Sequence, residues 1–233
     1  MGNIKKKNFF LLVGFQHLIL TALNENDEIF FSKELLINDT NKEENFSSLK
    51  KFLDENIFEL EKKFNYFIEE INLIIDYKDF ITIDVSTNKN FNTINNKVED
   101  YTSNLANIKD SVLRNMNDFK LIHMIINKFI VDKEDYYSIP EDIKNKNIFL
   151  EIRFICIKND IIENLQNFFS KFEISIKNIS YFDYVNSFKT LENDNIFILA
   201  SKLMDGYNPR EVGFIKKPVE NPGFFEKFFR LFN

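Results

Sequence analysis

Three apolar stretches separated by short polar breaks open the chain, at Phe9 to Val13, Leu18 to Leu23 and Ile29 to Ile37. Their length and spacing predict an antiparallel meander of strands. From Glu43 to Ile68 the apolar side chains recur at steps of three and four residues, which predicts a long helix with one core-facing side. Two more strands are expected at 71–75 and 80–85. The first unit therefore spans residues 8–85 and combines strands with one helix.

A second unit spans residues 86–185 and opens with the polar run 86–96. Its pattern predicts helices at 101–116 and 160–172, with Asp160 as an N-cap, and strands at 119–126, 128–131, 148–157 and 173–179. Beyond residue 186 the pattern weakens, apart from 195–203. Residues 186–221 are therefore interpreted as tail and linker, with Pro209, Pro218 and Pro222 favouring an extended chain. The fold class expected is α/β (α+β), in two parts without a deep cleft between them.

Residues 222–233 carry the clearest functional pattern. Placed on a helix at about 100° per residue, the apolar side chains fall in one arc of roughly 160°, and they are Phe224, Phe225, Phe228, Phe229, Leu231 and Phe232. Glu226, Lys227, Arg230 and Asn233 occupy the other side. So short a helix is marginal in water and forms on contact with an apolar partner. Lys227 and Arg230 favour anionic lipid as that partner. The alternative is a terminal helix packed on the chain's own core or in a partner's groove.

Composition and charge exclude several classes of protein. A net charge of -6 without a long Lys/Arg block argues against nucleic acid as a partner. The single cysteine, Cys156, lies in an apolar run and predicts a buried thiol. The N-terminal apolar run of five residues is too short for a signal peptide, and no run reaches eighteen apolar residues. The high phenylalanine content is typical of a biased genome and carries no functional weight.

No motif for catalysis, a cofactor or a metal is present. Glycine-rich phosphate loops, a nucleophile elbow and paired metal ligands are all missing. His17 and His123 are far apart in sequence, and His123, between two apolar neighbours, is interpreted as a half-buried structural residue. These observations predict a protein that is not an enzyme and that needs no cofactor.

The order of parts resembles the FtsA family, the actin-like proteins of bacterial cell division. In residues 117–180, Leu121-Ile122-His123-Met124-Ile125 and Phe129-Ile130-Val131-Asp132 follow one another as in the inserted, SHS2-like domain of that family, with Ile126-Asn127 in place of the usual proline step. Residues 9–85 resemble the first actin-like subdomain, called 1A. The segment FIKKPVENPGFFEKFFRLFN is similar to the family's linker and membrane-targeting helix.

Departures from the family limit what the resemblance implies. The family's D-x-G-[ST] loop is replaced by Gly14-Phe15-Gln16-His17, and the D-x-G-G-x-T loop and second lobe have no counterpart. Neither ATP binding nor the FtsZ-binding surface is carried over.

The resemblance implies a reduced FtsA-like protein on the cytoplasmic face of the bacterial inner membrane. Residues 222–233 would bind anionic inner-membrane lipid, residues 86–185 would contact other division proteins, and the protein could form a homo-oligomer. A soluble interaction module whose C-terminal helix docks into a partner's groove is the alternative, and an enzyme of unknown type is a third.

Overall fold

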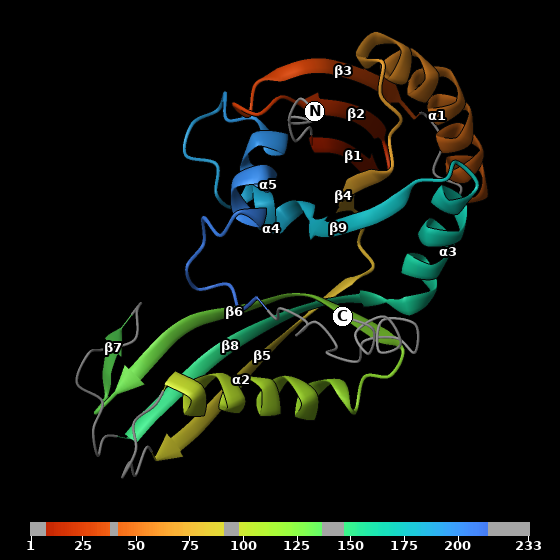
Figure 1. The fold of residues 1–233 in the computed structure, drawn as a ribbon. Coiled ribbons are helices and arrows are strands. Elements are labelled where there is room, and N and C mark those ends of the chain that lie inside the picture. The colour runs from red at the N-terminus through yellow and green to blue at the C-terminus, as the bar shows by residue number, and fades with distance from the viewer. Residues whose placement is uncertain (1–7, 38–41, 91–97, 137–146, 214–233) are drawn as a thin grey trace, which may run out of the picture.

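The computed structural model describes residues 8–37, 42–90, 98–136 and 147–213. These residues form two β-sheets, each with its own helices, and the chain passes three times between them (Figure 1). The mixed α/β class agrees with the sequence prediction. Residues 214–233, which hold the predicted membrane helix, lie outside the described residues.

The first sheet has five strands in the order β3-β2-β1-β4-β9. They are β1 (Asn8–Gly14), β2 (His17–Leu23), β3 (Ile29–Leu36), β4 (Glu70–Asp76) and β9 (Ser175–Tyr181). The first three pair antiparallel as the predicted meander, whereas β4 and β9 lie parallel to β1. Strand β1 is apolar and buried on both sides because helices cover both faces of the sheet.

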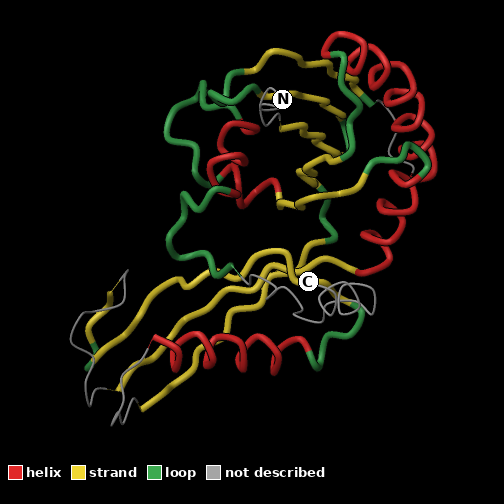
Figure 2. The backbone as a smooth tube through the Cα atoms, in the orientation of Figure 1, coloured by secondary structure: helices red, strands yellow, loops and turns green. Residues whose placement is uncertain are grey.

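Two pairs of helices enclose the first sheet. Helices α1 (Lys42–Phe64) and α3 (Asn159–Ser170) pack on one face with Phe9, Leu11 and Val13. Helices α4 (Phe182–Asn186) and α5 (Ile196–Met204) pack on the other face with Phe10 and Leu12. Figure 2 shows these helices flanking the strands. Helix α5 begins where the Asn195 side chain accepts hydrogen bonds from the amides of Phe197 and Ile198.

The second sheet is antiparallel, in the order β5-β8-β6-β7. Its strands are β5 (Phe80–Asn90), β6 (Phe119–Val131), β7 (Glu134–Tyr136) and β8 (Asn147–Lys158), and α2 (Val98–Leu113) covers one face. Leu105 of α2 shares a core with Phe154 and Cys156 of β8, so the predicted burial of Cys156 is confirmed. Lys158 takes the N-cap position of α3, and Asp160 lies in the first turn, so the prediction that Asp160 caps this helix is wrong.

The two sheets divide the chain differently from the expected units 8–85 and 86–185. Strand β5 pairs with β8 from Phe80 onward and belongs to the second sheet, while β9 pairs with β4 and belongs to the first. The second sheet is thus an insertion, residues 80–158, between β4 and α3. The expected strands 119–126 and 128–131 are one strand, with irregularities where Ile122 and Asn127 have no partner in β8. The chain also stays packed well beyond residue 186, because α5 completes a core.

Candidate functional site

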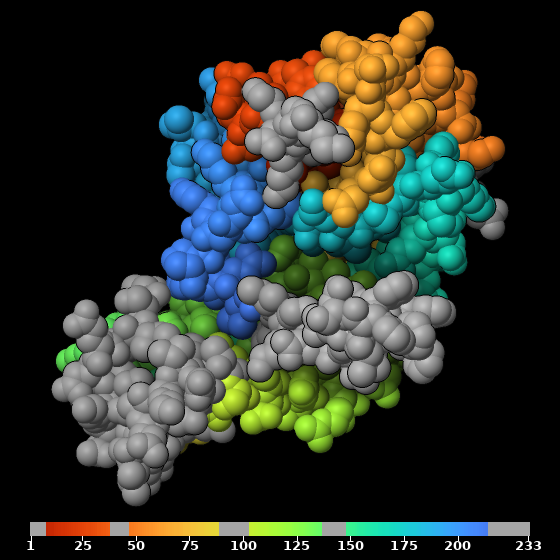
Figure 3. All heavy atoms as spheres, viewed as in Figure 1, coloured from red at the N-terminus to blue at the C-terminus, as the bar shows by residue number. Residues whose placement is uncertain are grey.

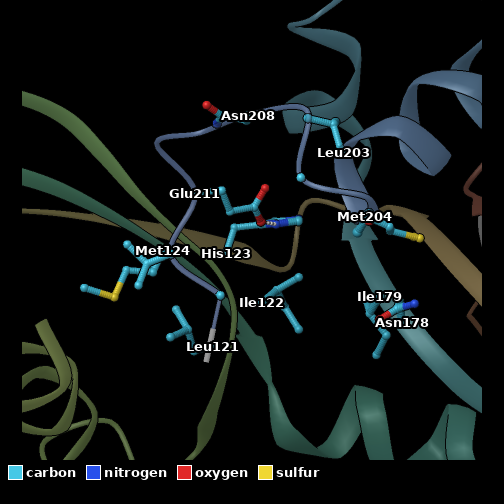
Figure 4. A pocket seen from close by; sticks show the side chains of 14 residues that line it. Leu121, Ile122, His123, Met124, Asn178, Ile179, Leu203, Met204, Asn208 and Glu211 are labelled. Atoms are coloured by element: carbon cyan, nitrogen blue, oxygen red, sulfur yellow. Dashed lines mark hydrogen bonds and ion pairs between the residues drawn. The ribbon is translucent and has the colours of Figure 1, made fainter. Parts of the chain in front are cut away.

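A buried polar cluster joins the two sheets to the last described residues. His123 projects from β6, and Asn208 and Glu211 from the segment that follows α5 (Figure 4). Tyr184 projects from α4. His123, Tyr184 and Asn208 are each less than a tenth exposed. We call these four side chains the junction.

Hydrogen bonds fix the protonation state of the histidine. The Tyr181 backbone N–H donates to Nε2 of His123 over 3.1 Å, so Nε2 acts as an acceptor. Nδ1 therefore carries the proton and donates to Oε1 of Glu211 over 2.7 Å. The Tyr184 hydroxyl donates to the other carboxylate oxygen over 2.6 Å, and Asn208 donates to the same hydroxyl over 3.0 Å. Every junction side chain is thus paired inside the protein.

The electrostatics favour an ionised Glu211. Burial opposes ionisation, but the hydrogen bonds from His123 and Tyr184 outweigh it and lower the pKa of Glu211. Burial and the hydrogen bond to Glu211 raise the pKa of Tyr184, which keeps its hydroxyl protonated as a donor. A carboxylate with two donors is the stable state of this cluster.

Backbone pairing holds the same segment against the second sheet. The amide of Ile126 donates to the carbonyl of Arg210 over 2.9 Å, and the amide of Val212 donates to the carbonyl of Met124 over 2.8 Å. The Arg210 guanidinium also donates to the carbonyl of Asn127, at the irregular position in β6. Side-chain and backbone contacts therefore fix residues 208–212 on β6, and Tyr184 ties them to the first sheet.

Contrary to the sequence expectation of no deep cleft, a pocket of about 490 Å³ lies beside the junction between the two sheets. Its lining comes from β6, β9, the end of α5 and the segment up to Gly213 (Figure 4). Apolar side chains form much of the wall, among them Leu121, Ile122, Ile179, Leu203 and Met204. The volume falls in the range of pockets that bind small molecules or a few side chains.

The side chains of the junction are hydrogen-bonded to one another and to the backbone. A general base needs a nitrogen free to take a proton, and both ring nitrogens of His123 are engaged in hydrogen bonds. The buried Ser180 also lines the pocket. Burial raises the pKa of the Cys156 thiol to about 11, which suppresses the reactive thiolate. Within the described ranges, no group of three His, Cys, Asp or Glu side chains could hold a metal ion.

The turn between β1 and β2 carries an aromatic contact. Phe15 contacts the ring of Tyr77 at a centroid distance of 5.0 Å, and the carbonyl of Gln16 accepts from the amide of Ile37. Asp76, at the end of β4, lies against Gly14. Burial raises the pKa of Asp76, the Asp183 carboxylate raises it further, and His17 opposes both. The charges of Asp76 and Asp183 therefore repel each other at this turn.

The sequence located part of this site. His123 lies on a strand as expected, but it is almost fully buried and not half-buried. Glu211 was missed, because an acidic residue in a region interpreted as linker gives no signal of burial. The predicted membrane-binding residues 224–232 lie outside the described residues. No helix among the described residues is long and apolar enough to cross a membrane.

No family model and no curated protein matches the sequence. Among solved structures, the chain is similar to the cytoplasmic domain of EpsL, an inner-membrane component of the type II secretion system of Vibrio cholerae, with 9% identity and a TM-score of 0.40 over 80% of this chain and 61% of that one. It is also similar to the PilM-PilN type IV pilus biogenesis complex, with 7% identity and a TM-score of 0.44 over 79% and 49%. A Bacteroides thetaiotaomicron protein with an actin-like ATPase fold matches at 17% identity and a TM-score of 0.33 over 81% and 58%. The chain spans less than two thirds of the length of each.

Proposed function

We propose that this protein is a non-enzymatic adaptor that attaches to a membrane surface through residues 222–233 and recruits a protein partner through its second sheet. The carrying observation is the junction, which fixes residues 208–212 to both sheets directly before the tail. A membrane anchor positions the body only through the segment that joins the two, and the junction holds the body's end of that segment. Here a buried ionised cluster supplies that attachment.

The junction supports attachment better than catalysis. An isolated charge inside a protein is costly unless it is paired, and Glu211 is paired by both His123 and Tyr184. Removing one partner leaves a buried group unsatisfied, so the cluster specifies one arrangement of the segment. We infer that this cluster is selected because it holds residues 208–212, from which the tail starts, in one place.

The second sheet offers a surface for a partner. Strand β5 pairs with β8 along its whole length, from Phe80 to Asn90. In the described part of the chain, no strand pairs with its other edge. An extended segment of a partner, or of a second copy in a homo-oligomer, could add there as a further strand. The Asp84–Arg153 ion pair joins β5 to β8 on the exposed face of the sheet.

Flotation with vesicles tests the membrane part of the proposal. The full chain should float with vesicles containing anionic lipid, and the double variant Phe228→Asp/Phe229→Asp should not. The substitution removes about 3 kcal/mol or more of apolar burial from a tail whose net binding is only a few kcal/mol, and it brings charge toward hydrocarbon. Glu226→Gln, on the polar side of the same helix, is the matched control and should keep or strengthen binding. Failure of the wild-type chain to float would favour the alternative, a soluble module whose helix docks into a protein groove.

The finer assignment, to the cell-division machinery on the inner membrane, is also a proposal. Fluorescent fusions of the wild type and the double variant test it in dividing bacterial cells. Enrichment of the wild type at the division site, lost in the double variant, would support it. A uniform distribution along the membrane would contradict the division role but leave the adaptor function standing.

A further inference from the structure

The pocket between the sheets points to an apolar occupant. Four of its polar side chains are already paired: His123 and Glu211 bind each other, Asn208 donates to Tyr184, and Asn178 donates to Asn72. They leave little demand for a charged ligand. Ile122, Ile179 and Met204, which are partly exposed, contribute apolar surface to its wall. Burial of apolar side chains is therefore the interaction that would stabilise an occupant of this pocket.

The last described residues of the chain lie at this pocket. Val212 and Gly213, the last described residues, are part of the wall, so the tail starts at the site. Gly223 follows ten residues later, which for a flexible linker corresponds to an average span of roughly 17 Å. A helix formed by the remaining eleven residues is about 16 Å long. The apolar arc of the tail can thus return to the pocket, at an effective concentration in the millimolar range.

Charge complementarity favours the same occupant. Residues 214–233 contain four basic and two acidic side chains, a net charge of +2. Since the whole chain carries -6, the rest of the chain carries -8. The tail is therefore attracted to its own body as it is to anionic lipid. Figure 3 shows the surface of the described residues on the side where the chain leaves α5.

We propose that the pocket lined by β6, β9 and the end of α5 is the docking site of the chain's own apolar helix, residues 223–233, which shelters there until an anionic membrane competes for it. The central side chains of the arc, Phe228 and Phe232, are those that enter. This inference rests on the proposed function, since the membrane is the competitor. It makes membrane attachment and access to the pocket mutually exclusive.

Disulfide trapping in the full chain tests this docking. Met204→Cys is combined either with Phe228→Cys on the apolar arc or with Lys227→Cys on the polar side. Both tail positions reach equally far, so an undocked tail would give equal rates. The native Cys156 is buried and does not compete. Docking predicts that the Phe228 pair closes at least about tenfold faster than the Lys227 pair, within one molecule.

Vesicles separate the two claims. Anionic vesicles should slow closure of the Phe228 pair, and the closed disulfide should prevent flotation until a reductant is added. Equal closure rates for the two pairs, or flotation of the closed form, would overturn the docking inference while leaving the adaptor function intact. Failure of the reduced proteins and of the wild type to float would instead overturn the proposed function. A circular dichroism spectrum like that of the wild type confirms that Met204→Cys is folded.

Discussion

Replacing Glu211 by Gln removes the charge at the centre of the junction while keeping the size of the side chain. Glu211 accepts one hydrogen bond at each carboxylate oxygen, from His123 and from Tyr184. Glutamine has a single acceptor oxygen, so at least one of these donors loses its partner. A hydrogen bond to a charged group contributes about 1.5–3 kcal/mol.

We expect Glu211→Gln to lower the free energy of unfolding by about 2 kcal/mol, which for a chain of this size lowers the melting temperature by about 4–8 °C. Urea unfolding at neutral pH measures the change. Glu192→Gln, an exposed acidic residue in the loop before α5, is the matched control and should leave stability nearly unchanged.

The pH dependence gives a second check on the same variant. The pKa of Glu211 lies below its ordinary value of 4.5 in the folded protein. Its stabilising contribution is therefore complete above that value and is lost as the pH falls through the lower folded pKa. The stability difference between wild type and Glu211→Gln should shrink in acid. The claim that the junction holds residues 208–212 would be wrong if Glu211→Gln unfolds at the same urea concentration as Glu192→Gln. It would also be wrong if the stability difference between wild type and Glu211→Gln grows in acid.

Two further results are expected. Calorimetric titration with Mg-ATP should show no saturable binding, because the turn after Gly14 carries Phe15, packed on Tyr77, and Gln16, and it lacks a carboxylate and a second glycine for phosphate. Binding tighter than about 100 μM, or roughly -5.5 kcal/mol, would contradict this. Cys156 should react with an alkylating reagent at pH 8 only on unfolding, because the side chain is fully buried and its pKa is raised to about 11; rapid labelling of the folded protein would show that β8 is open to solvent.

Local elements of this fold were readable from the sequence. Helix α1 was predicted because its apolar side chains recur at helical spacing over many turns, and β1 to β3 because polar breaks separate short apolar runs. Such patterns report which face of an element is buried. They do not report which element covers it.

The pairing of distant strands was not predictable for that reason. The sequence of β9 has the pattern of a half-buried strand and contains nothing that identifies its partner. Its neighbour β4, about a hundred residues earlier, is selected only when the core assembles. Likewise, His123 and Glu211 are 88 residues apart, and nothing around Glu211 marks it as buried. The junction exists because the insertion and the segment after α5 meet in space.

The most direct test of the membrane claim is the fluorescence of a single tryptophan placed in the tail. The chain contains no tryptophan, so Phe228→Trp introduces the only indole. We predict that anionic vesicles whose acyl chains carry bromine quench its emission, because quenching by bromine requires contact with the hydrocarbon, which docking in the pocket cannot give. Lys227→Trp, on the polar side, should be quenched less. Equal emission with brominated and unbrominated vesicles in lipid excess would show that the apolar arc does not enter the membrane, and the adaptor function would be wrong.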